Sequence, residues 1–257
     1  QRKERHIEIV WRELNGKKSL ILRTISLADK IFKNDNPSIR NQKFFAWGFL
    51  PFTILALWVD SVAFHQHYFD GRLLTNFMGT TYFLLFFYYA DAHLRKLMFV
   101  MVLLSYLGEI IFCKGLDFYA YRTEAIPLYV PFGHAIVYAS GYVFAHTNWA
   151  IAKDNMLKKF FAIGFALLFL GVGFFRNDMF SVLFGVFFFL LLKRKRWQNL
   201  YYFIALCVIY IELLGTYFQC WTWVPKTFDT IPTANPPMGA VFFYAGGDVL
   251  LAKIVQL

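Results

Sequence analysis

The chain alternates between long apolar blocks and short polar stretches over most of its length. Apolar blocks that approach the ~20 residues needed to cross a bilayer as a helix are typical of membrane spans, and flanking aromatic residues extend the shorter ones. The pattern predicts an all-α integral membrane protein. About eight transmembrane helices are expected, at roughly residues 44–65, 76–91, 96–113, 127–145, 159–175, 178–193, 199–218 and 236–256. Three polar residues, Arg176, Asn177 and Asp178, predict a tight hairpin turn between the fifth and sixth helices.

Residues 1–43 precede the first block and are polar and basic. Apolar positions between Ile7 and Ile31 recur at spacings that predict amphipathic helical pieces at the cytoplasmic membrane interface. Asn36–Pro37 is expected to end the last piece. A tail that binds other membrane subunits is the competing interpretation, and the sequence does not separate the two. Because this stretch lacks the apolar core of a signal peptide, we expect the first helix to act as an uncleaved signal.

Basic residues are distributed unevenly across the predicted spans. If residues 1–43 are cytoplasmic, 21 of the 26 Lys and Arg residues lie in cytoplasmic segments and five lie on the opposite side. Cytoplasmic loops of membrane proteins carry an excess of positive charge, so this distribution supports eight helices with both termini in the cytoplasm. The expected location is the cell membrane, as a multi-pass protein.

Composition agrees with a bilayer as the main partner. Hydrophobic residues make up 58% of the chain and charged residues 16%, which is more apolar than a typical soluble domain. The net charge of +10 could indicate nucleic-acid binding, but the basic residues lie between apolar blocks, so we attribute them to topology and expect no nucleic acid. Three cysteines are too few for a disulfide scaffold, although a Cys113–Cys220 bond is geometrically conceivable.

The region from the third to the fourth helix resembles the region from the seventh to the eighth. Each contains Glu near the outer end of a helix, Cys, an aromatic-x-aromatic pair, Ile-Pro, Pro-x-Gly and a helix with similar small residues. The matched pairs include Glu109/Glu212, Cys113/Cys220, Tyr119/Trp221, Tyr121/Trp223, Ile126/Ile231, Pro131/Pro237, Tyr138/Tyr244 and Gly141/Gly247.

The similarity predicts two four-helix repeats, at residues 44–145 and 146–257, that both begin on the cytoplasmic side. Such repeats are parallel and are related by an axis along the membrane normal. Chance similarity between two aromatic-rich segments is the alternative. The halves diverge where His134 matches Ala240 and where Asp248 matches Tyr142, as expected for one site built off the axis of a duplicated frame.

Ionisable residues inside predicted helices are functional candidates, because a charge in the bilayer is costly. Glu109 and Glu212 are the primary candidates for catalysis. A buried carboxyl group can stay protonated at neutral pH and serve as a general acid, while a second carboxylate stabilises a cation or activates water. A structural role, in which each Glu hydrogen-bonds the Pro-rich backbone opposite it, is the alternative.

Other polar residues complete the candidate site. His134 is a candidate base or packing residue, and Asp248 is a deeper candidate for catalysis. These side chains could converge on a metal, but the His patterns of membrane di-iron enzymes are absent, so we predict no metal and no cofactor. Candidate substrate-binding residues lie near the outer surface, where Pro-rich segments and aromatic loops are expected to wall and roof a cavity. These are Asp60, Tyr119, Tyr121, Trp221, Trp223 and Asn235.

Glu109–Gly133 and Glu212–Gly239, about a fifth of the chain, carry a resemblance to a known family. A helix-borne Glu, an aromatic-x-aromatic loop and a Pro-rich re-entry are similar to membrane-embedded carotenoid hydratases related to the membrane domains of lycopene cyclases. The resemblance implies acid-initiated addition of water to a polyene end group, with Glu109 or Glu212 as the proton donor. It also implies that no cofactor is needed.

Three classes of function therefore remain open at this point. The first is a hydratase/lyase- or cyclase-type enzyme of lipid metabolism that acts on a lipophilic small molecule. The second is a proton- or cation-coupled transporter or channel that uses the same intramembrane acids. The third is a non-catalytic subunit of a membrane complex. An enzyme predicts a closed, lipid-accessible pocket at the glutamates, whereas a transporter predicts a water path to both faces.

Overall fold

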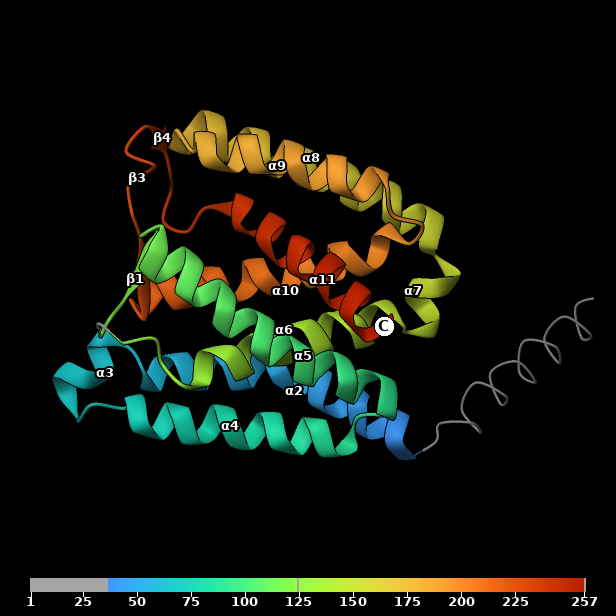
Figure 1. The fold of residues 1–257 in the computed structure, drawn as a ribbon, viewed down its shortest axis with the longest axis horizontal. Coiled ribbons are helices and arrows are strands. Elements are labelled where there is room, and N and C mark those ends of the chain that lie inside the picture. Colours follow the sequence, from blue (N-terminus) through green and yellow to red (C-terminus); the bar gives the residue numbers. More distant parts are fainter. Residues whose placement is uncertain (1–36, 124, 257) are drawn as a thin grey trace, which may run out of the picture. The chain divides into compact units, whose positions relative to one another are not determined.

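The structure, a computed structural model, describes residues 37–123 and 125–256 and is mostly helical (Figure 1). Among the described residues a helix forms in each of the eight predicted segments. The eight long helices are α2 (Pro37–Val59), α4 (Arg72–Tyr89), α5 (Ala92–Glu109), α6 (Tyr129–Ala145), α8 (Asp154–Arg176), α9 (Met179–Lys193), α10 (Gln198–Tyr217) and α11 (Val241–Gln256). The interfacial pieces expected before residue 37 lie outside the described residues.

Five helical stretches in the described part of the chain are long and apolar enough to cross a bilayer. They are Arg40–Val59, Ala92–Gly115, Asp154–Arg176, Gln198–Tyr217 and Met238–Val255. A sixth apolar helix, Met179–Lys193, is shorter. These lengths are compatible with a multi-pass helical membrane protein.

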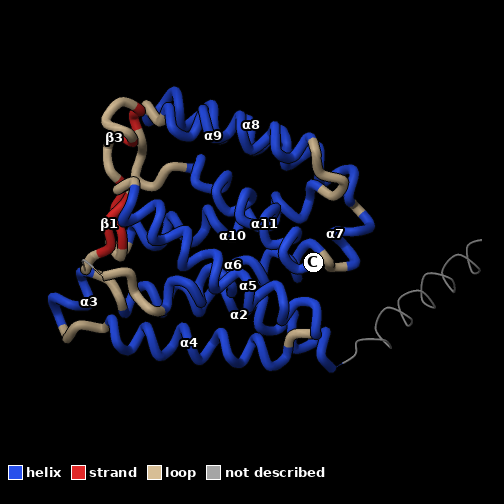
Figure 2. Tube along the Cα trace, in the orientation of Figure 1, coloured by secondary structure: helices blue, strands red, loops and turns tan. Residues whose placement is uncertain are grey.

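Short elements gather where the long helices end (Figure 2). The strands, which lie at one end of the helices in Figure 2, are β1 (Tyr119–Tyr121), β2 (Trp221–Trp223), β3 (Lys226–Thr227) and β4 (Ile231–Pro232). The short helical elements are α3 (Val62–His67), α7 (Asn148–Ala152), the π-helical turn η1 (Ile110–Gly115) and the 3₁₀ turn η2 (Met238–Ala240). We call the antiparallel pair of β1 and β2 the aromatic ribbon, and the end of the helices where it lies the ribbon end.

The first helix differs from the predicted 44–65 at both ends. It begins at Pro37, seven residues earlier, so the expected domain boundary after residue 43 falls inside α2. Proline suits the first turn of a helix, where its missing N–H is not needed. The helix ends at Val59, because the Ser61 hydroxyl accepts a hydrogen bond from the Phe64 amide (2.9 Å) and starts α3 instead. Asp60 therefore lies just after the helix.

The polar turn after α8 forms where the sequence predicts it. Arg176 ends α8, and Asn177 adopts the left-handed conformation (φ 52°, ψ 36°) that asparagine tolerates at the C-terminal end of a helix. Asp178 caps α9 by accepting a hydrogen bond from the Ser181 amide at 3.0 Å. The resulting hairpin brings α8 and α9 into antiparallel contact.

Four helices form the centre of the unit made by residues 41–257: α5 packs on α6 and α11, and α10 packs on the same two helices. Helices α6 and α10 approach closely at Gly141 of α6, where a Cβ would lie 2.8 Å from the Ile204 Cα of α10. The side chains of Tyr82 and Tyr210 donate hydrogen bonds to carbonyls of α2 and so attach it to α4 and α10. The core around these four helices is rich in buried phenylalanine, which comes from α2, α4, α8 and α9.

Gly141→Ala should destabilise the protein, because the added methyl group would force α6 and α10 apart. Overpacking of this kind costs roughly 1–3 kcal/mol, measured as a lower free energy of unfolding in detergent. Gly164→Ala in α8 is the matched control, since a Cβ there meets nothing within 4 Å. It should be neutral or stabilising by up to about 1 kcal/mol. Equal stability of the two variants would contradict the proposed tight contact.

Candidate functional site

The aromatic ribbon presents four rings on one face. Its register pairs Tyr119 with Trp223 and Tyr121 with Trp221, about a central pair of Ala120 and Thr222. Because side chains alternate along a strand, the four aromatic residues share one face and the central pair lies on the other. Trp221 and Trp223 are buried, whereas Ala120 and Thr222 are exposed. The aromatic face therefore points into the protein.

Glu109 lies beneath this face at the end of α5 and is only 2% exposed. Its Oε2 accepts hydrogen bonds from the hydroxyls of Tyr119 (2.9 Å) and Tyr121 (2.7 Å). Its Oε1 lies 3.0 Å from Nε2 of His134 on α6, within hydrogen-bond distance. All three partners are groups that can exchange protons.

Glu212 occupies the corresponding place on α10 and is also buried. Its Oε2 accepts hydrogen bonds from the indole N–H groups of Trp221 (2.9 Å) and Trp223 (3.0 Å). An indole N–H donates but does not accept, so these partners hold a carboxylate without offering it a proton relay. The two glutamates thus share a geometry and differ in the chemistry of their partners.

His134 is held from its other side by Tyr244 of α11. The two rings stack with centroids 4.9 Å apart and planes inclined by 7°. This contact fixes the plane of the imidazole ring in which its nitrogen meets Glu109. Neither the ring stacking nor its partner follows from the sequence spacing, because the two residues are on different helices.

A cavity of about 410 Å³ lies below the ribbon. Its lining includes Glu109 and Glu212, which contact the ribbon, and His134, which contacts Glu109, and most of the remaining wall is apolar. The apolar wall is contributed by α2, α5, α6, α10 and α11, with residues that include Phe49, Phe52, Met101, Leu104, Val137, Ile211, Phe243 and Leu250. A cavity of this size and polarity suits an apolar small molecule.

Seven of the predicted site residues meet at this cavity: Glu109, Glu212, His134, Tyr119, Tyr121, Trp221 and Trp223. Three do not line it. Asp248 is buried against the phenol groups of Tyr138 and Tyr201. The Asn235 side chain accepts a hydrogen bond from the Trp223 backbone amide at 3.1 Å and so holds the β2 strand of the ribbon in place.

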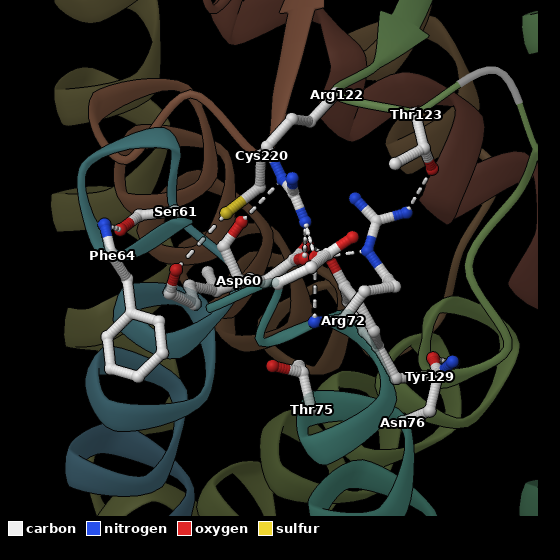
Figure 3. Close-up of polar contacts among 12 residues, drawn as sticks. Asp60, Ser61, Phe64, Arg72, Thr75, Asn76, Arg122, Thr123, Tyr129 and Cys220 are labelled. Carbon is white, nitrogen blue, oxygen red and sulfur yellow. Dashed lines mark hydrogen bonds and ion pairs between the residues drawn. The ribbon is translucent and has the colours of Figure 1, made fainter. Parts of the chain in front are cut away.

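The third residue that does not line the cavity is Asp60, which forms the centre of a cluster of ion pairs (Figure 3). Its carboxylate is completely buried. Its Oδ1 contacts Nε of Arg72 (2.6 Å) and Nη2 of Arg122 (3.1 Å), and its Oδ2 accepts a hydrogen bond from the Tyr129 hydroxyl (2.7 Å). Arg122 also binds Asp70 at 2.5 Å. Because Arg122 directly follows β1, the cluster anchors the ribbon to the corner between α2 and α4.

The sequence did not single out Arg72, Arg122, Tyr129 or Tyr244 as members of these clusters. A signal existed for the arginines, because they are two of the five basic residues on the predicted exterior side, and Asp60 is also predicted near the outer end of its helix. Their convergence on Asp60 depends on contacts 12 and 62 residues apart in the chain.

Neither a disulfide nor a group of metal ligands is found among the described residues. Cys113, Cys207 and Cys220 are all free, so the conceivable Cys113–Cys220 bond does not form in this structure. Cys220 instead contacts the Leu57 carbonyl at 3.2 Å. Among the described residues no group of three His, Cys, Asp or Glu side chains could hold a metal ion.

Comparison with models of protein families, with curated proteins and with solved structures finds no match to this chain. The fold and site thus define the protein only by class: a helical protein with several potential membrane spans and a pair of buried glutamates at one apolar cavity.

Asp60→Asn should destabilise the protein strongly, because it leaves two buried guanidinium groups without their shared carboxylate. Removing one partner of a buried ion pair typically costs about 3–5 kcal/mol, and the retained Arg122–Asp70 contact should keep the loss at the lower end. Asp70→Asn is the control, since this carboxylate is 48% exposed and an exposed pair contributes at most about 1 kcal/mol. Denaturation in detergent would measure both, and similar losses would contradict the central role of Asp60.

The Arg122–Asp70 ion pair predicts that the stability of the fold depends on pH. The hydrogen bond from Arg122 lowers the pKa of Asp70 below its ordinary value. A lowered pKa in the folded state stabilises the fold above the ordinary pKa, and this stabilisation is lost as pH falls through the lowered value. Wild type should therefore begin to lose its small advantage over Asp70→Asn as pH falls below about 4, where the unfolded chain takes up a proton at Asp70. The advantage should vanish only below the lowered pKa of the folded state, where Asp70 is protonated in both states.

Proposed function

We propose that the protein is a membrane-embedded enzyme that acts on a lipophilic substrate through general acid and base chemistry of Glu109 and Glu212. The observation that carries the proposal is that both glutamates line one largely apolar cavity of about 410 Å³. An apolar wall selects a lipophilic molecule, and the polar groups at one end define where it reacts. A purely structural glutamate has no need of a cavity beside it.

The hydrogen-bond partners support different roles for the two acids. Glu109 contacts two phenols and an imidazole, so a proton that it gives to the substrate can be replaced through His134. Glu212 contacts two indole N–H groups, which favour a carboxylate that stays negative. We assign Glu109 as the proton donor and Glu212 as the group that stabilises a cation.

These roles suit addition of a proton to a carbon–carbon double bond. The π electron pair of the double bond would take up the Glu109 carboxyl proton and form a new C–H bond. The other carbon of the double bond would become a carbocation opposite Glu212, and Glu109 would become a carboxylate. Water could add to the cation and return a proton to the Glu109–His134 pair, which is hydration. Loss of a neighbouring proton to the same pair would instead give isomerisation. If a second double bond of the substrate first attacks the cation and forms a C–C bond, the same proton loss from the new cation completes ring closure. The resemblance to carotenoid hydratases favours an isoprenoid or carotenoid-like substrate.

We further propose that all eight long helices span the cell membrane, as two parallel four-helix repeats with both termini in the cytoplasm. The distribution of basic residues supports this orientation. The register of the ribbon supports the repeat. Exchanging each residue for its counterpart 102 positions away converts the pair Tyr119–Trp223 into the pair Tyr121–Trp221. A two-fold axis through the centre of the ribbon has this property.

Glu109→Gln should lower kcat/KM by roughly 10²–10⁴-fold, the range that a positioned acid contributes. Glu212→Gln should also be severely impaired, because an amide cannot stabilise a cation by charge. The experiment expresses each variant in a host and compares extracted lipids and pigments by chromatography and mass spectrometry with wild type and an empty vector. Asp117→Asn is the matched control, since Asp117 is an exposed carboxylate in the segment that joins α5 to α6.

If wild type changes the lipid profile and both glutamine variants change it equally, the enzyme proposal fails. If proton or cation flux into vesicles depends on Glu109 whereas no lipid is converted, the transporter alternative is correct. Loss of a membrane complex on truncation of residues 1–36, with no effect of the glutamine variants, would favour the subunit alternative.

The division of roles has its own test, using the substrate found by lipid analysis. His134→Gln should change the pH dependence of kcat, because it removes a proton-exchanging partner of Glu109. Trp223→Phe should lower kcat without changing the shape of that pH profile, because it removes only a hydrogen-bond donor to Glu212. The opposite pattern would reverse the assignment of the two acids.

A further inference from the structure

The cavity reaches the surface of the protein along α5 and α11. Leu107 of α5, Ile111 of the turn η1 that continues α5, and Leu250 of α11 all line the cavity. The same three residues are 52%, 45% and 48% exposed. A side chain that contacts the cavity and is also half exposed lies at its rim. The two helices pack on one another and lie side by side in Figure 1, so these residues mark an opening along the seam between them.

Glycines leave room along this seam. Gly108 of α5 and both Gly246 and Gly247 of α11 line the cavity. A Cβ built on Gly246 or Gly247 would meet nothing within 4 Å, and one on Gly108 would meet only Phe112, at 3.9 Å. The packing glycines are different, since a Cβ on Gly215 would lie 2.0 Å from the Trp221 ring. The absence of side chains at the seam therefore provides open space and not a closer helix contact.

The surroundings of the seam are apolar. Both helices belong to stretches that are long and apolar enough to cross a bilayer, Ala92–Gly115 and Met238–Val255. The seam also leads directly to the reactive groups, because Gly108 is adjacent in sequence to Glu109. Toward the ribbon, by contrast, the rings of Tyr119 and Trp223 pack with centroids 4.8 Å apart and cover the cavity.

We propose that the seam between α5 and α11 is a lateral entrance through which an apolar molecule dissolved in the bilayer reaches Glu109. This inference rests on the proposed function for what happens inside the cavity, but the entrance itself does not depend on the reaction. Its occupant is a hydrocarbon-rich molecule taken from the membrane, since the rim side chains are leucine and isoleucine. A water-soluble substrate would find no polar group at this rim.

The test uses the full chain in phospholipid vesicles and a photoreactive probe, a long-chain alkyl diazirine dissolved in the bilayer. Illumination converts the diazirine into a carbene that inserts into nearby bonds, and mass spectrometry identifies the modified peptides. Fragment spectra of wild type should place the label on Glu109 and Tyr244 themselves, since the neighbouring Leu107 and Ile111 are half exposed and can be labelled from the bilayer directly. A short water-soluble diazirine of the same reactivity should leave Glu109 and Tyr244 unlabelled.

Gly247→Trp should abolish the cavity labelling, because the ring would fill the open space at the seam. Gly164→Trp is the matched control, since that glycine also faces open space but lies outside the cavity, and it should be labelled like wild type. Leu107→Ala should increase the labelling by widening the rim. Leu103→Ala is its control, as Leu103 is 58% exposed on the same helix and does not line the cavity.

Three results would overturn the entrance: no cavity labelling of wild type by the alkyl probe, stronger labelling by the water-soluble probe, or undiminished labelling of a folded Gly247→Trp. If Gly247→Trp does not fold, the leucine pair decides, and equal labelling of Leu107→Ala and Leu103→Ala is the overturning result. Failure of the proposed function is distinguishable, because Glu109→Gln would then leave the lipid profile unchanged while wild type is still labelled through the seam.

Discussion

Two carboxylates buried at the end of a helical unit must each be given hydrogen-bond donors, because a buried charge or polar group without partners is costly. Glu109 and Glu212 find those donors in the four rings of the aromatic ribbon. This requirement explains why β1 and β2 pair with their aromatic residues on one face. It also brings α5 and α10, which carry the glutamates, beneath the same ribbon.

The surrounding structure holds this arrangement in place. The buried carboxylate of Asp60 binds Arg72 and Arg122, and Arg122 continues directly from β1. Asn235 supports β2 through the Trp223 amide. Gly141 allows α6, which carries His134, to approach α10 closely. Residues expected to touch substrate, such as Asp60 and Asn235, thus act one step further away, by positioning the ribbon that covers the cavity.

The two halves of the ribbon give the glutamates different chemical surroundings within one geometry. Tyrosine and histidine can pass protons, whereas tryptophan can only donate a hydrogen bond. In the proposed repeat, this difference in partners is what gives one proton donor and one stable anion. The stacking of His134 on Tyr244 adds a further difference, because the position that matches His134 in the second half is Ala240.

The sequence by itself determined the helical class, the approximate helix positions, the hairpin turn at Asn177 and the placement of Glu109 and Glu212 in apolar helices. These features follow from local apolar patterns and from the cost of charge in apolar surroundings, both of which can be read along the chain. Only the tertiary structure decided that Asp60 contacts two arginines and that the cavity opens between α5 and α11. Each of these depends on side chains that are distant in sequence, and neither periodicity nor composition indicates which distant groups will meet.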